Sequence, residues 1–295
     1  MKRTINLLLI IISTVFVLTG CQNAPAEANR PWPKTVVMSN LNDETSRNVA
    51  ERLLKMSSGE IQSKVFFDHV DQINRFLKPE ELTNGFEEVS IAKPKYDPYD
   101  IQARWEAEFP EFLGYNCRIT AWSLLRDLIQ TEKGTAGKPD YIMMDLFSLD
   151  LDPSAIPDAD GLEKFQTLYT GIDTENTKDI SVHLKHLQED WKKRHISFKE
   201  GDASLISVVL HDQVDGDKLF IGHTGILYEV GEKELYFLEK IAFQEPYQLV
   251  KVSSRSELSD YLMEKYDVEF NQPTASPFVL ENDQLIEGYR NHSAP

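Results

Sequence analysis

The stretch KLFIGHTGILYEVGEKELYFLEKIAF, residues 218–243, is rich in β-branched and aromatic side chains and is interrupted once, by VGEK at residues 230–233. Two apolar runs separated by a short, glycine-containing break predict a β-hairpin. On either side of it, EGDASLISVVLHD (200–212) and YQLVKVSS (247–254) have a similar composition and predict two more strands. We therefore expect an antiparallel sheet in the C-terminal half of the chain.

The rest of the chain is mainly helical in character. Apolar residues recur at helical spacing in five segments: 39–56, 63–77, 118–130, 179–198 and 256–266. Helices that precede a late antiparallel sheet indicate an α+β fold. We expect one α+β domain over residues 35–270, with a helical insertion at about 131–199. Residues 271–295 are expected to form a loosely attached C-terminal tail, in which PFVLE (277–281) could add an edge strand.

Cys117 lies at the predicted start of the helix in GYNCRITAWSLL, residues 114–125. Asn116, directly before it, is a residue type that favours the N-cap position. A thiol at a helix N-terminus is exposed to the partial positive charge of unpaired backbone N–H groups, which lowers its pKa from about 8.5 toward 3.5–7.5. Cys117 is therefore a candidate nucleophile. Such a residue also needs a base within hydrogen-bond reach and a third group that orients the base.

His223, at the start of a predicted strand, is the candidate base. If the hairpin turns about Gly231, Glu239 lies opposite His223 and can orient the imidazole. A change of one residue in the register would place Lys240 there instead, because successive side chains of a strand point to opposite faces. The segment that follows holds two further candidates for the third position: Gln244 and Glu245.

This arrangement resembles the NlpC-type branch of the papain-like cysteine peptidases and amidases, whose members often cut peptide or amide bonds in bacterial cell walls. The shared features are a cysteine at a helix start, a GD pair before a strand (Gly201, Asp202), HTGI (223–226) opening the next strand, and a polar residue on the neighbouring strand. The resemblance spans about residues 110–250 and implies a papain-like core. It also implies a nucleophile, a base and a polar third member: Cys117, His223 and Glu239.

Two features depart from that family. About 100 residues separate Cys117 from His223, so a large helical insertion must lie between the helix and the sheet. Papain-type enzymes carry a glutamine six residues before the cysteine for the oxyanion hole, and here that position is Glu111. The oxyanion donors would then be backbone N–H groups near Cys117, with Tyr115 as a candidate helper.

A second resemblance covers most of the chain. Four short segments are similar to those of a family of Gram-positive lipoproteins known only as a domain of unknown function, number 4300. These segments are SNL (39–41), FFDHV (66–70), NCRITAWSLL (116–125) and FQEPYQ (243–248). The resemblance implies an exported lipoprotein and brings no established activity.

The first 21 residues resemble the export signal of a bacterial lipoprotein. Two basic residues precede an apolar run, residues 5–18, of the length expected for a signal-peptide core. The run ends in LTGC (18–21), which resembles the lipobox, where the cysteine is diacylated and begins the mature chain. Two acyl chains give stable anchoring. We expect residues 1–20 to be removed, Cys21 to carry lipid on the extracellular face of the cytoplasmic membrane, and residues 21–34 to form a tether.

Charge and composition argue against several kinds of partner. The formal net charge is −17, and it becomes −19 once residues 1–20, with their two basic side chains, are removed. Nucleic acid is not expected as a partner, because binding phosphates requires clusters of Lys and Arg. With Cys21 lipidated, Cys117 is left as a free thiol and no internal disulfide can form.

Neither a metal site nor a cofactor is expected. Three histidines lie on or near one predicted helix, His183, His186 and His195, but the surrounding lysines favour a solvated helix face over a zinc site. The acidic loop DLDPSAIPDADG, residues 150–161, lacks the spacing of acidic residues that an EF-hand requires.

Two functions from different classes remain open. In the first, the protein is a tethered thiol peptidase or amidase that acts on cell-wall or other exported peptides. In the second, it is a lipoprotein adaptor or ligand-binding module that retains the fold without the activity. The second is a real alternative because cysteine is among the most frequently buried residue types. The reactivity of Cys117 toward iodoacetamide at pH 6 distinguishes the two.

Overall fold

The computed structural model describes residues 30–132, 134–269 and 271–292. The chain divides into a short N-terminal unit, Met1–Pro31, and a folded unit that begins at Trp32. The predicted export signal and Cys21 lie outside the described residues, so the lipid anchor stays a prediction. Within the described ranges, no helix combines the length and the apolar character needed to cross a membrane.

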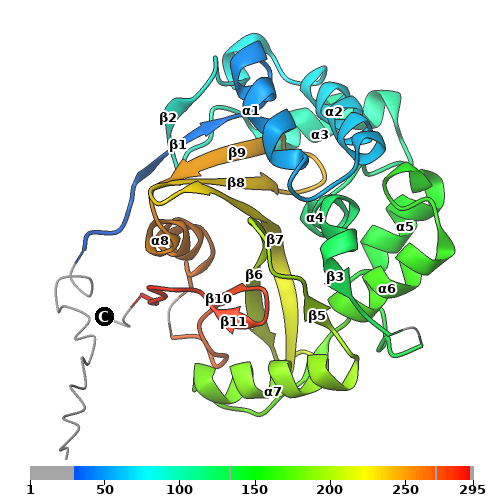
Figure 1. The fold of residues 1–295 in the computed structure, drawn as a ribbon, viewed down its shortest axis with the longest axis vertical. Helices are drawn as coiled ribbons and strands as arrows, with labels where there is room; N and C mark the ends of the chain where they lie inside the picture. Colours follow the sequence, from blue (N-terminus) through cyan, green and yellow to red (C-terminus); the bar gives the residue numbers. More distant parts are fainter. Residues whose placement is uncertain (1–29, 133, 270, 293–295) are drawn as a thin grey trace, which may run out of the picture. The chain divides into compact units, whose positions relative to one another are not determined.

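A large antiparallel sheet forms the centre of the folded unit (Figure 1). Its strands follow the order β11-β10-β6-β7-β8-β9-β1-β2, and β4 pairs with the N-terminal end of β7. A second, small sheet pairs β3 with β5. The strands are β1 (Thr35–Ser39), β2 (Glu87–Ser90), β3 (Ile129–Gln130), β4 (Ile172–Asp173), β5 (Ser197–Phe198), β6 (Ala203–Asp212), β7 (Lys218–Gly231), β8 (Glu234–Lys240), β9 (Tyr247–Val252), β10 (Phe278–Glu281) and β11 (Gln284–Leu285).

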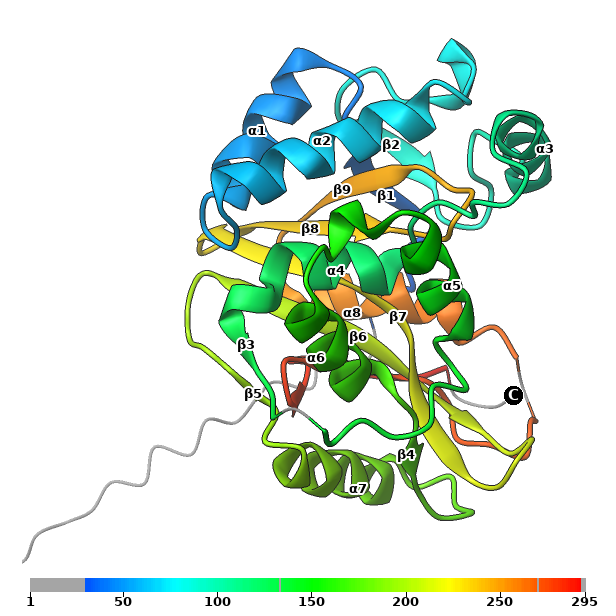
Figure 2. The ribbon, with the colours of Figure 1, turned by 90° about the vertical axis from the view of Figure 1, so that its right-hand side faces the viewer.

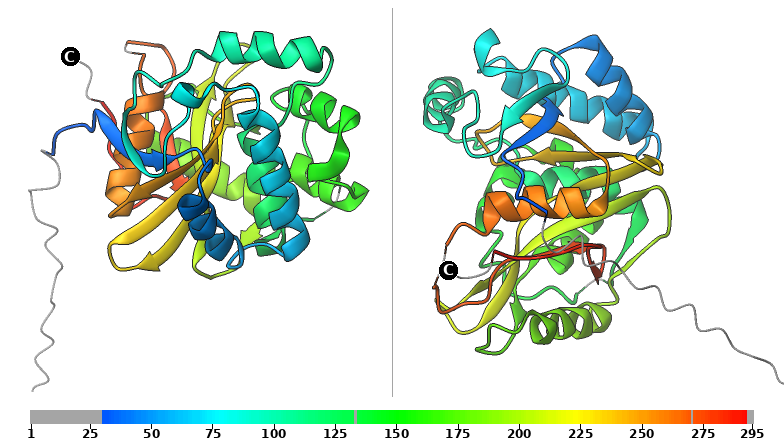
Figure 3. Two further views of the ribbon diagram at one scale, coloured as in Figure 1. Left: turned by 90° about the horizontal axis from the view of Figure 1, so that it is seen from above. Right: turned by 90° about the vertical axis from the view of Figure 1, so that its left-hand side faces the viewer.

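Helices cover both faces of this sheet. The first seven contribute to one hydrophobic core, and Figure 2 shows α1 and α2 near β8 and β9, with α4 to α6 beside β6 and β7. The last helix, α8, packs against the opposite face and forms a second core there, as the views in Figure 3 show. The helices are α1 (Glu44–Leu54), α2 (Glu60–Asn74), α3 (Pro98–Glu108), α4 (Cys117–Leu125), α5 (Met143–Leu151), α6 (Ala159–Tyr169), α7 (Ile180–Lys193) and α8 (Arg255–Tyr266).

The side chains of β8 contribute to both hydrophobic cores, one on each face of the sheet. Tyr236 and Leu238 join the core that includes α4, whereas Leu235 and Phe237 join the core that includes α8. Successive side chains of a strand point to opposite faces, so a strand between two layers must be apolar on both. This requirement explains the almost unbroken apolar run of residues 235–238.

The predicted α+β class is confirmed, and the four central strands β6 to β9 lie where the sequence indicated. The predicted insertion at 131–199 contains α5, α6 and α7 together with the short strands β4 and β5. Several elements were not expected, among them β1 and α3. Strand β1 pairs with both β9 and β2, and α3 follows a turn-rich segment, with Asp97 as its N-cap.

The C-terminal residues belong to the fold, so the prediction of a loosely attached tail after residue 270 is wrong. The segment PFVLE does form a strand, but β10 is internal, because it pairs with β6 on one side and with β11 on the other. Phe278, Val279 and Leu280 are all buried. The apolar side chains of this strand fill both faces of the sheet, which is why the segment is held in place.

The last residues of the predicted tether also contact the folded unit. The ring of Trp32 stacks on that of His292 with 3.9 Å between centroids, and the guanidinium carbon of Arg290 lies 4.0 Å from the centroid of the Trp32 ring. Lys34 forms an ion pair with Glu264 of α8 at 2.5 Å. Within the described residues, the part of the tether from Trp32 onward is therefore packed against the C-terminal part of the fold.

Candidate active site

Cys117 is the first residue of α4, as the sequence predicted. Asn116 has extended backbone geometry, and its side-chain oxygen accepts a hydrogen bond from the backbone N–H of Ile119 at 3.1 Å. The backbone carbonyl of Asn116 accepts the N–H of Thr120. Helix geometry leaves the backbone N–H groups of Cys117 and Arg118 without acceptors inside the helix. These two donors therefore lie next to the thiol and can bind a negatively charged oxygen.

Asp145, a buried carboxylate on α5, holds the start of α4. It accepts hydrogen bonds from Nδ2 of Asn116 at 2.9 Å and from Nε and Nη2 of Arg118 at 2.8 and 2.6 Å. The remaining nitrogen of the guanidinium, Nη1, donates to the backbone carbonyl of Ile221 on β7 at 3.0 Å. One carboxylate thus fixes the residues on both sides of Cys117, and Arg118 ties them to the strand that carries His223.

The edge of β7 to which Arg118 bonds has no pairing strand over a few residues. Strand β6 pairs with one edge of β7 from Lys218 to Tyr228. On the other edge, β8 pairs from Gly225 onward, while β4 pairs only with Lys218 and Leu219. The N-terminus of α4 packs against β7, and Arg118 bonds to it within this gap. The gap lets a side chain of β7 reach the thiol at the end of α4.

A β-bulge directly before His223 adjusts the direction of its side chain. Val208 pairs with His223 and Val209 pairs with Ile221, so Gly222 is the extra residue on β7. Bulges increase the local twist of a strand and redirect the side chains beside them. The bulge therefore places His223 at the point where the sheet opens toward Cys117.

The three predicted residues lie next to one another. The imidazole of His223 lies close enough to the thiol of Cys117 to lower the pKa of the thiol. Its Nε2 lies 2.6 Å from Oε2 of Glu239, which leaves Nδ1 as the nitrogen that faces the sulfur. The other oxygen of Glu239, Oε1, accepts a hydrogen bond from the hydroxyl of Tyr261 on α8 at 2.5 Å. All three predicted residues are buried, and Cys117 is only 5% exposed.

The predicted register is wrong by two residues, although the predicted pair is formed. Glu239 lies directly opposite Gly225 rather than opposite His223. Since side chains alternate along a strand, a shift of two keeps Glu239 and His223 on the same face as diagonal neighbours, within reach of long side chains. The shift has a local cause, because the pairing is irregular between Glu229 and Gly231, next to the turn.

Gly225 is required by the close approach of β7 and β8 at this point. A Cβ atom there would lie 2.5 Å from two ring carbons of Phe237 and 2.6 Å from the carbonyl oxygen of Leu238. We expect Gly225→Ala to destabilise the protein by about 2 kcal/mol through overpacking, which corresponds to a fall in Tm of about 4–8 °C. Gly201→Ala is the matched control, because no atom lies within 4 Å of the added Cβ. Equal Tm values for the two variants, measured by calorimetry, would contradict this account.

Electrostatics favour a charged form of the Cys117–His223 pair. Burial raises the pKa of the Cys117 thiol, but the hydrogen bond and positive charge of His223 and the charge of Arg118 outweigh it, and the pKa is lowered. Burial likewise opposes protonation of His223, but the bonds to Cys117 and Glu239 raise its pKa to about 9. For Glu239, the charge of Lys265 and the bonds from His223 and Tyr261 outweigh burial, so its pKa is lowered. All three shifts act in the direction of thiolate, imidazolium and carboxylate.

Two elements close the site. The ring of Tyr266 stacks on the imidazole of His223, with 4.9 Å between centroids and 23° between planes. The loop after β8 is held by buried Lys240, whose ammonium donates to the backbone carbonyls of Ala242, Phe243 and Glu245. Burial lowers the pKa of Lys240 to about 7, against the opposing charges of Glu245 and Cys117. These elements account for the small exposure of the thiol.

The supporting residues predicted from the sequence have different positions. The hydroxyl of Tyr115 is hydrogen-bonded to the carbonyl of Asp152 at 3.1 Å and to Ser154 at 2.8 Å, so it braces the turn after α5. Gln244 lies in the loop after β8 and is half-buried, and Glu239 holds the third position instead. Glu111 is exposed. The oxyanion donors that the described structure offers are the backbone N–H groups at the start of α4.

The histidines outside this site have separate surroundings. His183 is fully buried and bonded to Thr174, so the prediction of a solvated face is wrong for this residue. His186 and His195 pair with Glu175 and Glu132. Within the described ranges, no three residues of the His, Cys, Asp or Glu types are grouped as metal ligands would be.

Sequence reasoning missed the residues that position the dyad. Asp145 lies 28 residues after Cys117, Tyr261 and Tyr266 lie more than 140 residues after it, and none of the three belongs to a local motif. The one available signal was Arg118, a charged residue in an otherwise apolar segment, since a buried guanidinium requires a partner.

Comparison with known proteins places the chain in a family without assigning an activity. One family model, described as a domain of unknown function (DUF4300), matches residues 37–286. No curated protein and no solved structure matches the chain.

Proposed function

Because the chain belongs to this family of unknown function, we propose its activity from its own geometry: a thiol peptidase or amidase. Cys117 is the nucleophile, His223 is the base and Glu239 orients the imidazole. The observation that carries this proposal is the placement of Cys117 at a helix N-terminus beside the imidazole of His223, which is itself hydrogen-bonded to a buried carboxylate. A nucleophile, a base and an orienting group in this order are the minimum set for acyl transfer by a thiol.

The reaction proceeds in two steps. The Cys117 thiolate attacks the carbonyl carbon of the scissile amide, and the backbone N–H groups of Cys117 and Arg118 bind the oxyanion. His223 donates its proton to the leaving amine as the C–N bond breaks, which leaves a thioester on the enzyme. His223 then takes a proton from water, the resulting hydroxide attacks the thioester, and the released products are a carboxylic acid and the thiolate.

The order of the elements supports the more specific proposal of a papain-like fold of the NlpC type. A helix that begins with the cysteine precedes the strand that carries the histidine, and the polar third residue lies on the next strand. With lipid on Cys21, the enzyme would be held at the outer face of the membrane, so cell-wall or other exported peptides are the proposed substrates. This substrate class depends on the predicted export signal.

One observation favours a second function. Cys117 is 5% exposed and His223 is 1% exposed, which is also what a structural cysteine in the core would show. In that case the protein is a lipoprotein adaptor or binding module on the same fold. For the peptidase, Tyr266 or the loop after β8 must move to admit a substrate.

Hydrolysis tests the proposal directly. Peptidoglycan fragments and short peptides are incubated with the chain lacking residues 1–21, and the products are identified by mass spectrometry. Cleavage that disappears in Cys117→Ala, while the Tm is retained, is the expected result. If no fragment is cleaved and the thiol titrates as an ordinary cysteine, the adaptor is correct and the peptidase is not.

The rate of hydrolysis is expected to follow a bell-shaped dependence on pH. The pKa of His223 is raised to about 9, because the bonds to Cys117 and Glu239 outweigh the burial that lowers it, so the imidazolium is retained up to that pH and lost above it. The lower limb follows protonation of Cys117, whose pKa is lowered despite burial. Initial rates across the pH range check this, and an upper limb near 6.5 would contradict it.

A further inference from the structure

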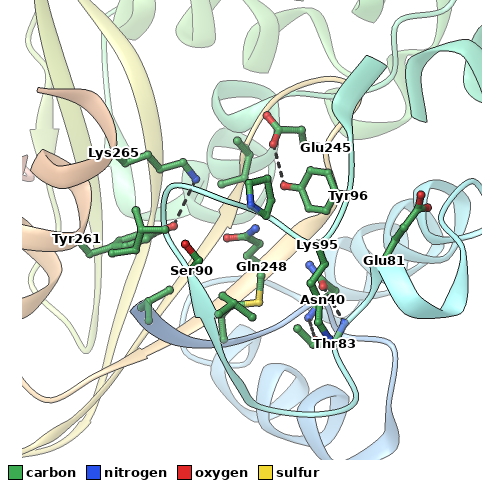
Figure 4. A pocket seen from close by; sticks show the side chains of 16 residues that line it. Asn40, Glu81, Thr83, Ser90, Lys95, Tyr96, Glu245, Gln248, Tyr261 and Lys265 are labelled. Carbon is green, nitrogen blue, oxygen red and sulfur yellow. Dashed lines mark hydrogen bonds between the residues drawn. The ribbon is translucent and has the colours of Figure 1, made fainter. Parts of the chain in front are cut away.

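A small cavity lies next to Glu239 of the candidate active site. Its volume is about 180 Å³, and Figure 4 shows its side chains, which come from β1, the segments before and after β2, the loop after β8, β9 and α8. Tyr261, which donates to Glu239, and Gln248, which pairs with Glu239 across β8 and β9, line its wall. The cavity therefore adjoins the candidate active site but does not contain Cys117 or His223.

Four charged side chains line this cavity, and two of them are paired with charges outside it. Lys95 forms an ion pair with Glu87 at 2.6 Å, and Glu81 forms one with Arg104 at 2.8 Å. These pairs neutralise one cation and one anion of the wall. The two remaining charges are Lys265 and Glu245.

Lys265 and Glu245 form no ion pair among the described residues, although the charge of Lys265 acts on Glu239 and that of Glu245 acts on Lys240. The ammonium of Lys265 lies 3.5 Å from the hydroxyl of Tyr261 and 5.6 Å from the centre of its ring. The carboxylate of Glu245 accepts a hydrogen bond from Tyr96 at 2.8 Å. In Figure 4 the two side chains reach the cavity from α8 and from the loop after β8. Charges in a half-buried wall are stabilised when a ligand supplies the opposite charge.

The rest of the wall is largely aliphatic. Apolar side chains from β1, β2 and the adjoining segments contribute to it: Val36, Met38, Val89, Ile91, Pro94 and Ile241. The volume is below the range of about 300–1,000 Å³ that is typical for drug-sized ligands. An ammonium, a carboxylate and a short apolar surface together match a small zwitterion with an aliphatic side chain.

We propose that this cavity binds a small aliphatic zwitterion, either a free α-amino acid or a dipeptide, whose carboxylate pairs with Lys265 and whose ammonium pairs with Glu245. The apolar wall receives the side chain. This inference goes beyond the proposed hydrolysis, because binding requires neither the thiolate of Cys117 nor the imidazole of His223.

Isothermal titration calorimetry of the full-length protein tests the proposal. The probes are glycine, L-alanine, L-valine, L-leucine and L-leucylglycine, and the last one distinguishes free amino acids from dipeptides. We expect L-valine or L-leucine, or the dipeptide, to bind at least tenfold more tightly than glycine. Two analogues of leucine, 4-methylpentanoate without the ammonium and 3-methylbutylamine without the carboxylate, should each bind at least tenfold more weakly than leucine. No binding of any zwitterion, or equal binding of the analogues, overturns the proposal.

Variants locate the site. Lys265→Met and Glu245→Gln should each weaken binding at least tenfold, and Glu245→Gln retains an acceptor for Tyr96. Lys64→Met is the matched control, because Lys64 is exposed on α2, and it should bind as the native protein does. Cys117→Ala should also retain binding. Binding that survives both Lys265→Met and Glu245→Gln places the ligand elsewhere and refutes the assignment, whatever the outcome of the hydrolysis experiment.

Discussion

Replacing His223 with alanine is expected to raise the pH midpoint of Cys117 alkylation, toward or above the value of about 8.5 of an ordinary thiol. In the native protein, the hydrogen bond and charge of His223 outweigh the burial that raises the pKa of the thiol. Without the imidazole, the thiol is still buried and still lies at the start of α4. Burial disfavours the thiolate, so the pKa of the thiol rises. The measurement is the rate of iodoacetamide modification as a function of pH.

The control for this experiment is His186→Ala. His186 lies on α7, is partly exposed and pairs with Glu175, so its removal should leave the midpoint unchanged. A native midpoint near 8.5, or a midpoint that does not move in His223→Ala, would show that the hydrogen bond between the two residues does not activate the thiol. The protein would then be the adaptor or binding module.

Asp145→Ala is expected to cost about 3–5 kcal/mol of folding free energy, because it leaves the guanidinium of Arg118 without its carboxylate in a site that is almost fully buried. For a domain of this size the fall in Tm is about 6–20 °C. The variant also removes the acceptor for Nδ2 of Asn116, so the N-cap of α4 is less firmly held. Thermal unfolding measured by circular dichroism checks the effect.

Asp150→Ala is the matched control on the same helix. Asp150 is exposed, and its removal should change the stability by no more than about 0.5 kcal/mol. Asp145→Asn keeps the shape of the side chain and one acceptor oxygen. Its Tm should therefore lie between those of Asp145→Ala and Asp150→Ala. If Asp145→Ala melts at the temperature of Asp150→Ala, the carboxylate does not hold the start of α4 and Cys117 must be positioned by other contacts.

The local parts of the candidate site could be predicted because their causes lie within a few residues. Asn116 caps a helix through the N–H of a residue three positions later, so the position of Cys117 follows from the sequence alone. The hairpin was recognisable from its composition and its break. Its register was missed by two residues, because the irregularity beside Gly231 has no distinct sequence signal, but the alternation of side chains preserved the correct face.

The sequence by itself determined the α+β class, the central strands and the helix that begins at Cys117, and it offered Glu239 as one of several candidate partners of His223. Only the tertiary structure decided that Asp145 and Arg118 hold the start of α4, that Tyr261 supports Glu239, and that β10 is an internal strand. It also decided where Lys265 and Glu245 meet a common cavity. The physical reason is the range of the interactions. Caps, turns and strand alternation act over a few residues, whereas buried charges and apolar strands find partners far along the chain, wherever the packed layers bring them together.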